Sequence, residues 1–252
     1  MIPIKDEKEI EIMRQAGRIL SGVMKRIALM VSHGDSTLDL DKLAEKLIIE
    51  AGAQPAFKGY GSGRNAYPAT LCISVNNEVV HGIPRQNKKL QQGDIVGLDC
   101  GVKYKGYFSD MAVTVPVGKI SSEAQRLINV TKNSLDLTIR TIKPNIYLGD
   151  ISYEIQNYIE KNKFSVVRQF CGHGIGRELH EEPPVLNFGK KGTGPKLLPG
   201  MVLAFEPMVN QGRYEVEVSG DGWTVVTKDG SLSAHFEHTI LVTKKGCEVL
   251  TR

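Results

Sequence analysis

The chain has 252 residues, with 32 lysines and arginines against 28 aspartates and glutamates, so its net charge is +4. This mild excess is scattered over isolated lysine pairs, which argues against direct nucleic-acid recognition, since that needs a larger clustered charge. Apolar residues make up 41% of the chain, as in ordinary globular proteins, and no run of about 18 apolar residues predicts a membrane span. The four cysteines show no CxxC spacing, and the charged amino terminus has no secretion signal. We therefore expect reduced thiols in a cytoplasmic protein.

The first part of the chain predicts two helices and two strands. Apolar residues recur at three- and four-residue steps from Ile10 to Val31, which indicates a long amphipathic helix. A second helix follows the segment GDSTLD and carries an apolar face from Leu40 to Ile48, with Gly52 as its stop. Residues 70–84 then read as a strand, an Asn-Asn turn and another strand.

Two apolar segments, 95–102 and 107–115, flank the turn KYKG and predict a β-hairpin. Each carries a carboxylate in its middle, Asp99 and Asp110. With the turn centred between residues 104 and 105, these two residues face each other directly, and a bulge at Gly106 would shift the register by one. Opposed like charges are unfavourable unless a cation lies between them or one is protonated. The alternative is a solvent-facing pair on a half-exposed hairpin.

The second part of the chain predicts two more helices and three strand segments. One helix begins where Ser122 and Gln125 fit a capping box and runs to about residue 142, and the next spans roughly 151–162. Apolar segments at 201–209, 222–230 and 233–243 predict strands, with Asp229-Gly230 as the turn between the last two. No long linker divides the chain, so we expect one α+β domain over residues 1–252.

A weak internal repeat relates residues 1–115 to residues 120–243. The segment GDIVGLD, which ends at Asp99, resembles GMVLAFE, which ends at Glu206. Each half places a His-Gly-Ile motif before two acids, in the order His81, Asp99 and Asp110 in the first half and His173, Glu206 and Glu237 in the second. This shared order favours a duplication about a pseudo-twofold axis over chance similarity.

Four carboxylates and a histidine that converge inside a sheet need strong positive charge. Oxygen ligands with few imidazoles and no thiolate suit Mn, Fe, Co or Zn. Carboxylates able to bridge suggest two ions about 3.5–4 Å apart, a pair that holds an oxygen nucleophile and a polarised carbonyl or phosphoryl group. The pattern therefore indicates a hydrolytic metal site.

The histidines differ in their sequence context. His173 lies between two glycines, which let the backbone approach closely and favour a ligand or pocket role. His180 could reach the same cleft as a hydrogen-bond donor, or be a loop residue beside Glu181-Glu182. His81 is a third cleft group or the end of a strand. His235 shares a strand face with Glu237, and Trp223 is either a core residue, which is the default interpretation, or a pocket wall.

The segments that hold these residues resemble a known family in order and spacing over nearly the whole chain. They are VNNEVVHGIP, GDIVGLDCGV, GYFSDMAVT, CGHGIGRELHEEP, GMVLAFEPM and FEHTILVT. The chain is similar to type I methionine aminopeptidases, which belong to the pita-bread (creatinase-like) metallopeptidases. The resemblance implies the α+β pita-bread fold, in which helices cover a curved antiparallel sheet.

The resemblance also implies the roles of individual residues. The ligands of two divalent ions (Co, Mn, Fe or Zn) would be Asp99, Asp110, His173, Glu206 and Glu237, with Asp110 and Glu237 bridging. His81 and His180 would act on the substrate side, and Glu206 would also handle the proton of the nucleophile. The methionine pocket would include Tyr67, Cys72, Leu179 and Trp223.

The implied reaction is removal of the amino-terminal methionine from nascent proteins and peptides whose second residue is small. A hydroxide bridging the metals would attack the first peptide carbonyl. The partners would be nascent chain ends, with room for a transient ribosome contact, and we expect a cytoplasmic monomer that binds no membrane.

The chain departs from the family pattern in three places. The segment FKGYGSGRNAYPATLC is longer before its Tyr-Pro than in common bacterial members, Leu179 replaces an aromatic residue found in some, and Val80 replaces a cysteine. One rival interpretation is a proline-directed aminopeptidase or dipeptidase, which usually carries an extra amino-terminal domain. Another is an inactive binding module, although such relatives have lost ligands.

Overall fold

The first helix of the computed structural model, which describes residues 2–252, confirms the predicted periodicity. Helix α1 spans Glu7–Met30 and buries an apolar stripe against the sheet. Asp6 caps it by accepting hydrogen bonds from the backbone of Lys8 and Glu9, while the Glu9 carboxylate accepts one from the Asp6 backbone N–H. This reciprocal capping satisfies donors that the first turn leaves without partners.

The other helices also form where the sequence places them, with corrections at their starts. They are α2 (Thr37–Glu50), α3 (Ser122–Thr141) and α4 (Leu148–Lys161). The predicted capping box at Ser122 is wrong, because Ser121 caps α3 and accepts a hydrogen bond from the Ala124 N–H. Helix α4 begins earlier than predicted, because the Asp150 carboxylate accepts a hydrogen bond from the Tyr147 N–H and stabilises the extra turn.

A main antiparallel sheet and two small sheets form the rest of the described chain. The main sheet runs β1 (Gln54–Pro55), β4 (Ile95–Tyr104), β5 (Tyr107–Pro116), β14 (Glu237–Val242), β9 (Val202–Phe205), β7 (Gly172–Gly174) and β8 (Glu181–Val185), with β2 (Leu71–Val75) on β4 and β15 (Cys247–Val249) on β14. The small sheets are β13 (Ser233–His235), β10 (Met208–Asn210) and β6 (Ser165–Val166), and β11 (Val216–Val218), β12 (Val225–Thr227) and β3 (Glu78–Val80). A short 3-10 helix, η1, covers Gly63–Asn65.

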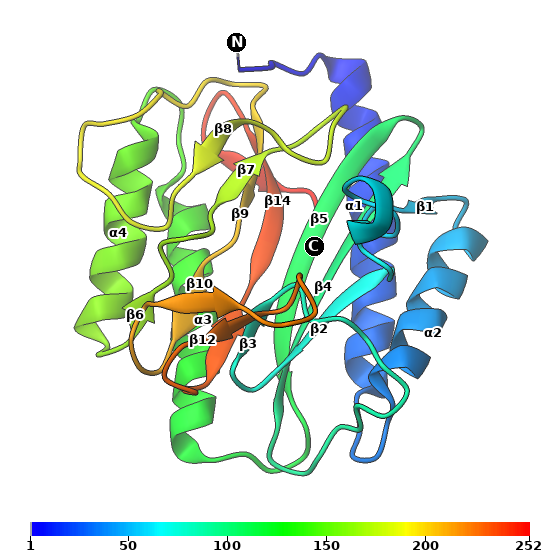
Figure 1. Cartoon of the computed structure of the whole chain (residues 1–252). Helices are drawn as coiled ribbons and strands as arrows, with labels where there is room; N and C mark the ends of the chain where they lie inside the picture. Colours follow the sequence, from blue (N-terminus) through cyan, green and yellow to red (C-terminus); the bar gives the residue numbers. More distant parts are fainter. Residues whose placement is uncertain (1) are drawn as a thin grey trace.

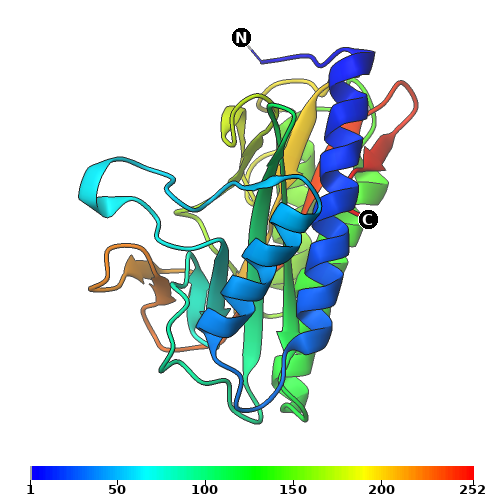
Figure 2. The same ribbon diagram turned by 90° about the vertical axis from the view of Figure 1, so that its right-hand side faces the viewer.

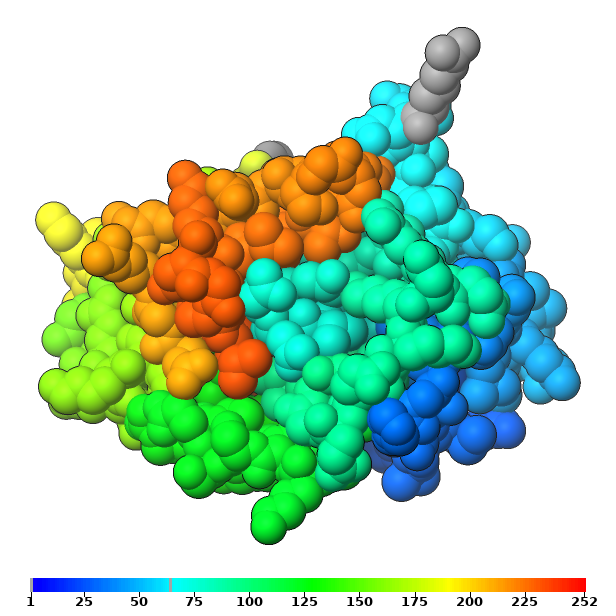
Figure 3. Space-filling view, turned by 60° about the horizontal axis from the view of Figure 1, so that its bottom comes forward, coloured from blue at the N-terminus to red at the C-terminus, as the bar shows by residue number. Residues whose placement is uncertain are grey.

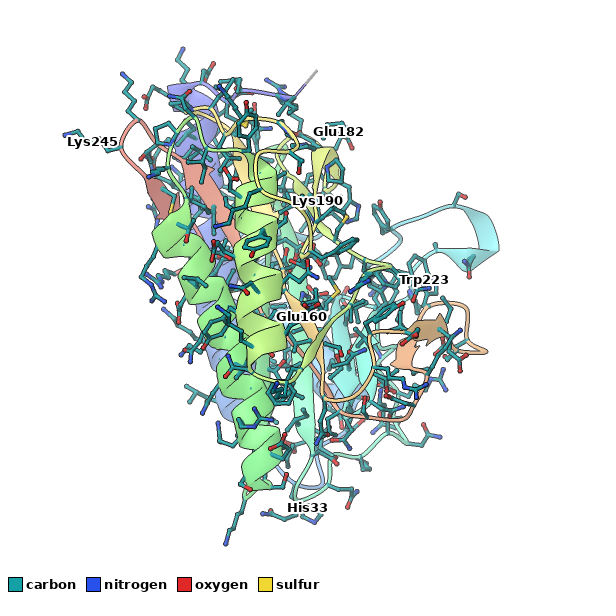
Figure 4. All side chains as sticks on the ribbon, turned by 90° about the vertical axis from the view of Figure 1, so that its left-hand side faces the viewer. His33, Glu160, Glu182, Lys190, Trp223 and Lys245 are labelled. Carbon is teal, nitrogen blue, oxygen red and sulfur yellow. The ribbon has the colours of Figure 1, made fainter. Side chains whose placement is uncertain are left out.

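The helices lie on one face of the main sheet. Figure 1 shows α1 and α2 behind one half of the sheet and α3 and α4 behind the other, and Figures 2 and 4 show the two pairs from opposite sides. Each pair closes its own apolar cluster against the strands, around Leu20 and Leu98 in one half and around Ile155 and Phe205 in the other. The small sheet of β13, β10 and β6 also packs against α3 and α4. The small sheet of β11, β12 and β3 lies in front of the main sheet in Figure 1, on the side away from the helices, where polar side chains can project.

The register of the central hairpin corrects one prediction. Asp99 pairs with Ala112 and Asp110 with Gly101, so the two carboxylates are diagonal neighbours and not directly opposed. The turn centres on Lys105 and Gly106, which both have positive φ (48° and 87°), as a two-residue hairpin turn requires. The two acids still share one face, because this register differs from the predicted one by an even number of residues.

Several predicted strands are divided between sheets. The segment 70–84 supplies β2 to the main sheet and β3 to a small one, and the segment 201–209 is interrupted after Phe205 by Glu206 and Pro207. Proline has no backbone N–H to give to a ladder, so the strand ends there. The turn at Asp229-Gly230 exists, but it connects β12 to β13, which pair with different strands.

No helix within residues 2–252 combines the length and the apolar character needed to cross a membrane.

Substitution of two glycines in α1 tests how closely this helix packs. A Cβ at Gly17 would lie 2.1 Å from the backbone oxygen of Leu250, whereas at Gly22 nothing lies within 4 Å. We expect Gly17→Ala to lower the free energy of unfolding by about 1–3 kcal/mol through overpacking. Gly22→Ala is the matched control and should raise it by roughly 0.5–1 kcal/mol. Urea unfolding measures both, and equal stabilisation by the two changes would contradict the packing argument.

Candidate metal centre and adjoining cavity

The strand register brings all five predicted ligands to one face of the main sheet. Asp99 and Glu237 both pair with Ala112, and Asp110 lies two residues from it on the same strand. His173 pairs with Ala204, and Glu206 follows two residues later. Since side chains two apart on a strand share a face, these five point to the same side of the sheet, away from the helices.

The ligand atoms are close together. One ligand atom each from Asp110, His173 and Glu237 lies within 4.8 Å of the others. His173 Nε2 lies 3.6 Å from Glu206 Oε1. Asp99 contributes an oxygen that is buried without a hydrogen-bond partner among the described residues, as does Glu237. Buried oxygens without partners are costly, so a ligand that satisfies them is expected here.

The electrostatics of the cluster favour bound positive charge. Burial raises the pKa of Asp99 to about 7. Burial and neighbouring carboxylates raise the pKa values of Asp110, Glu206 and Glu237 well above the ordinary range. The raised pKa values mean that the cluster binds protons more tightly than free carboxylates do. A divalent cation can take the place of these protons. The donor set, carboxylate oxygens and one imidazole, fits a divalent metal.

His173 is oriented as a metal ligand requires. Its Nδ1 lies 2.8 Å from the carbonyl oxygen of Gly174 and therefore donates to it, which leaves the lone pair of Nε2 facing Glu206. Burial lowers the pKa of His173 to about 4, so the ring is neutral near pH 7. The flanking glycines allow this packing, since a Cβ at Gly172 would lie 2.2 Å from the Ala204 oxygen and one at Gly174 2.2 Å from the Glu182 oxygen.

The cluster forms the polar floor of a cavity of about 170 Å³. All the other residues predicted for the site also line it, namely His81, His180, Tyr67, Cys72, Leu179 and Trp223. Sequence reasoning assigned no site role to five further lining residues, Phe57, Val80, Phe170, Cys171 and Met208, and left open whether Tyr60 contributes. The only signal for Tyr60 was its place in the long segment before Tyr67.

An aromatic wall closes one side of the cavity. The Tyr67 hydroxyl shares its one proton between the backbone oxygens of Leu71 and Gly82, so it is fixed to β2 and to the segment that follows β3. Its ring meets Trp223 edge to face, with 5.2 Å between centroids. Trp223, labelled in Figure 4, lies in the connection between β11 and β12, is partly exposed and lines the cavity, so the default interpretation of a core residue is wrong.

His81 is held in an unusual backbone conformation. Its φ is +59°, in the left-handed region that residues with a Cβ seldom adopt. A Cβ at the next residue, Gly82, would lie 2.3 Å from the backbone oxygen of Ile73, so the chain here packs tightly on β2. Burial and the nearby His180 lower the pKa of His81 to about 4. Strained residues of this kind cluster at functional sites, which supports the cleft interpretation over a plain strand end.

His180 stands at the exposed rim and does not bond to the neighbouring acids. Its ring contacts His173 edge to face at 4.4 Å, and its Nδ1 lies 2.6 Å from the Tyr60 hydroxyl. The Glu181 carboxylate pairs with Lys5 and accepts the Arg177 N–H instead. The alternative of a loop residue held by Glu181 therefore does not match the geometry.

His235 lies behind Glu206. It is buried, and its Nε2 is 3.7 Å from Glu206 Oε2 without a hydrogen-bond partner among the described residues. This distance exceeds that of a hydrogen bond but places the ring against the carboxylate.

Comparison with known proteins agrees with this geometry. The sequence profile of metallopeptidase family M24 matches residues 11–244, and the chain belongs to this family. It is 52% identical over 252 residues to the methionine aminopeptidase of Clostridium perfringens, covering 100% of this chain and 99% of the relative. The solved structure of methionine aminopeptidase from Thermotoga maritima superposes with a TM-score of 0.97 at 45% identity, and each chain is covered in full.

More distant structures share the fold. Prolidase from Pyrococcus furiosus superposes with a TM-score of 0.80 at 22% identity, covering 99% of this chain but 65% of the prolidase. The predicted pita-bread fold is therefore confirmed. Family membership and the ligand cluster together support the use of divalent metal by this chain.

Metal binding can be tested through stability. Mn²⁺ added to metal-free protein should stabilise it by about 2.7 kcal/mol at a free concentration one hundred times the dissociation constant. The stabilisation by metal should be smaller at pH 5.5 than at pH 7.5, because the raised pKa values let protons compete for the carboxylates at the lower pH. Thermal unfolding with and without metal measures it.

The matched variants for that experiment are two buried aspartates. Asp110→Asn should reduce the gain in stability that added metal produces. Asp41→Asn should keep it, because Asp41 is also buried with a raised pKa but lies outside the cluster and caps the backbone of Thr70 and Leu71. A metal shift that is equal in both variants would contradict the assignment.

Proposed function

We propose that this chain is a metal-dependent aminopeptidase that removes the amino-terminal methionine from peptides and nascent proteins. The observation that carries the proposal is the junction of a carboxylate-histidine cluster with a small apolar cavity walled by Tyr67, Cys72, Leu179 and Trp223. One part suits amide hydrolysis and the other a linear apolar side chain. The full-length similarity to methionine aminopeptidases supports this activity.

We propose two divalent ions, of Co, Mn, Fe or Zn, held by Asp99, Asp110, His173, Glu206 and Glu237. Asp110, Glu237 and His173 would hold the metal most directly in this proposal, since one ligand atom of each lies within 4.8 Å of the others. When bound, such cations polarise a peptide carbonyl and make water acidic enough to attack at neutral pH. The residue types and the unpartnered oxygens fit this use.

The residues around the cluster divide the remaining tasks. Glu206 lines the cavity beside His173, where its carboxylate can take the proton of the attacking water and return it to the leaving amine. His180 donates a hydrogen bond to the oxygen of the attacked carbonyl, where negative charge develops. His81 lies beside Trp223, with 6.1 Å between ring centroids, and orients the substrate from that side of the cavity.

Selectivity follows from the same cavity. The methionine side chain would lie against Tyr67, Leu179 and Trp223, and the second residue would lie nearer the carboxylates. A small second residue fits there, whereas a bulky one would clash with the crowded floor. The expected partners are nascent chain ends, and a transient contact with the ribosome agrees with such substrates.

We further propose that the chain acts as a monomer in the cytoplasm. Its cysteines are free thiols, two of them buried, as expected in a reducing compartment.

We also propose that residues 1–115 and 120–243 descend from a duplication. The central strands β5 and β14 pair antiparallel, with β4 and β9 as their outer neighbours. The residue before α2 pairs with Lys89 and the residue before α4 pairs with Lys196, which is the same relation in each half. The His-Gly motifs do not take matching places, because His173 lies on β7 of the main sheet and His81 follows β3 of a small one.

The substrate assay separates this function from its rivals. With added Mn²⁺ or Co²⁺, the protein should release methionine from the peptide Met-Ala-Ser and act more slowly when the second residue is bulky. Cleavage only before proline would support a proline-directed enzyme, and no turnover in metal-loaded protein would support a binding module. The second and third outcomes both contradict the proposal.

Two histidine variants separate substrate-side catalysis from metal binding. His180→Ala should lower kcat/KM by about 10²–10³-fold, the usual cost of one oxyanion donor, while metal affinity stays near that of the parent protein. His173→Ala removes a ligand, so it should weaken metal binding, and excess metal should partly restore its activity. Activity measured against metal concentration compares them. Full restoration of His180→Ala by metal would refute its assigned role.

A further inference from the structure

Tyr60 makes a direct contact with the proposed oxyanion donor. Its hydroxyl lies 2.6 Å from His180 Nδ1, and the two rings meet edge to face at 5.1 Å. No other hydrogen bond of the His180 side chain is found among the described residues, so this contact is what orients the ring. The two residues are 120 positions apart in the chain, and the contact depends on the loop that carries Tyr60.

The chemistry of the pair assigns the direction of the hydrogen bond. A neutral imidazole has one accepting and one donating nitrogen, and the tautomer is set by the bond that one of them makes. A phenol is a stronger acid than an imidazole N–H, so the Tyr60 hydroxyl donates to Nδ1. The proton of the ring is then on Nε2.

The loop that carries Tyr60 is tied down on both sides. The backbone of Tyr60 accepts a hydrogen bond from the Tyr67 N–H at 2.8 Å and donates one to the Phe57 oxygen at 2.8 Å. Near the tip of the loop, the Trp223 indole N–H donates to the backbone oxygen of Asn65 at 3.0 Å. Figure 2 shows this loop extending over the β11–β12 hairpin, and Figure 3 shows the two segments protruding together from the surface.

We propose that Tyr60 is a positioning residue that holds His180 with Nδ1 accepting and Nε2–H available to the cavity. The proposal rests on the proposed function, because it specifies how His180 becomes a hydrogen-bond donor to the attacked carbonyl. It also gives the long loop a role: contacts with Phe57, Tyr67 and Trp223 place the hydroxyl, and the hydroxyl places the imidazole. A residue that was only a wall of the cavity would need its ring and not its hydroxyl.

Tyr60→Phe tests the hydroxyl alone, because it keeps the ring. We expect kcat for Met-Ala-Ser to fall about 10–100-fold, by analogy with the loss of the hydrogen-bond partner that orients a metal-ligating histidine. KM and metal affinity should stay nearly unchanged. Tyr153→Phe is the control, since Tyr153 is similarly exposed (37% against 42%) but lies on α4, and it should keep full activity. Unchanged kcat in Tyr60→Phe, or a change in KM alone, would overturn the proposal.

A double variant tests whether Tyr60 acts through His180. If it does, Tyr60→Phe should cost little further activity in the His180→Ala background, because the effects of coupled residues do not add. Full additivity of the two losses would contradict the proposal.

Nitrogen NMR of the metal-free protein tests the tautomer without any turnover. In the parent protein, His180 should show an unprotonated, hydrogen-bonded Nδ1 and a protonated Nε2, and Tyr60→Phe should lose the hydrogen-bond shift at Nδ1. A proton on Nδ1 in the parent protein would overturn the proposal. If the parent protein released no methionine, the proposed function would fail, and this spectrum would still report on the Tyr60 contact by itself.

Discussion

The structure depends on one electrostatic constraint. Four carboxylates share one face of a sheet, and among the described residues no lysine or arginine pairs with them. Strands β4, β5, β9 and β14 each place an acid at or just beyond the middle of the sheet, and their apolar partners fill the helix-covered face. Burial raises the pKa of every acid in the cluster, so the fold tolerates them only with protons or a bound cation. The helices, the register and the central strand pair all serve to hold this charge in place.

The sequence alone was sufficient to predict features that depend on the helical repeat of apolar residues and on the alternation of side chains between the two faces of a strand. The long amphipathic run from Ile10 onward identified α1, and alternation along the strands put Asp99 and Asp110 on one face even though the predicted register was wrong. An even shift in register leaves faces unchanged, which is why the shared face of Asp99 and Asp110 was predictable and their direct opposition was not. The complete ligand set came from the family resemblance. The error came from the turn, where Lys105 takes a left-handed conformation that ordinary propensities disfavour.

Features that depend on long-range contacts could not be read from the sequence. The pairing of β3 with β12 joins segments far apart in the chain and divides what looked like simple hairpins. Trp223 is a cavity wall because the β11–β12 hairpin folds back towards Tyr67, and nothing in its local sequence indicates that. The contact of Tyr60 with His180 needs two loops to converge, and loop conformation is the least determined by local pattern.

The carboxylate cluster and the loop residues around the cavity therefore differ in how well they tolerate changes in sequence and loop length. The cluster lies on paired strands, where moving one acid to the next residue would turn it to the helix-covered face. The substrate side consists of His81 in a strained turn, His180 at a rim, and Tyr60 and Trp223 on loops that bond to each other. Loop lengths can vary there without disturbing the strands, so the long segment around Tyr60 can reshape the cavity while the carboxylate cluster stays in place. Because His180 contacts both His173 and Tyr60, a change in that loop would reach the ligand cluster through His180 under the proposed mechanism.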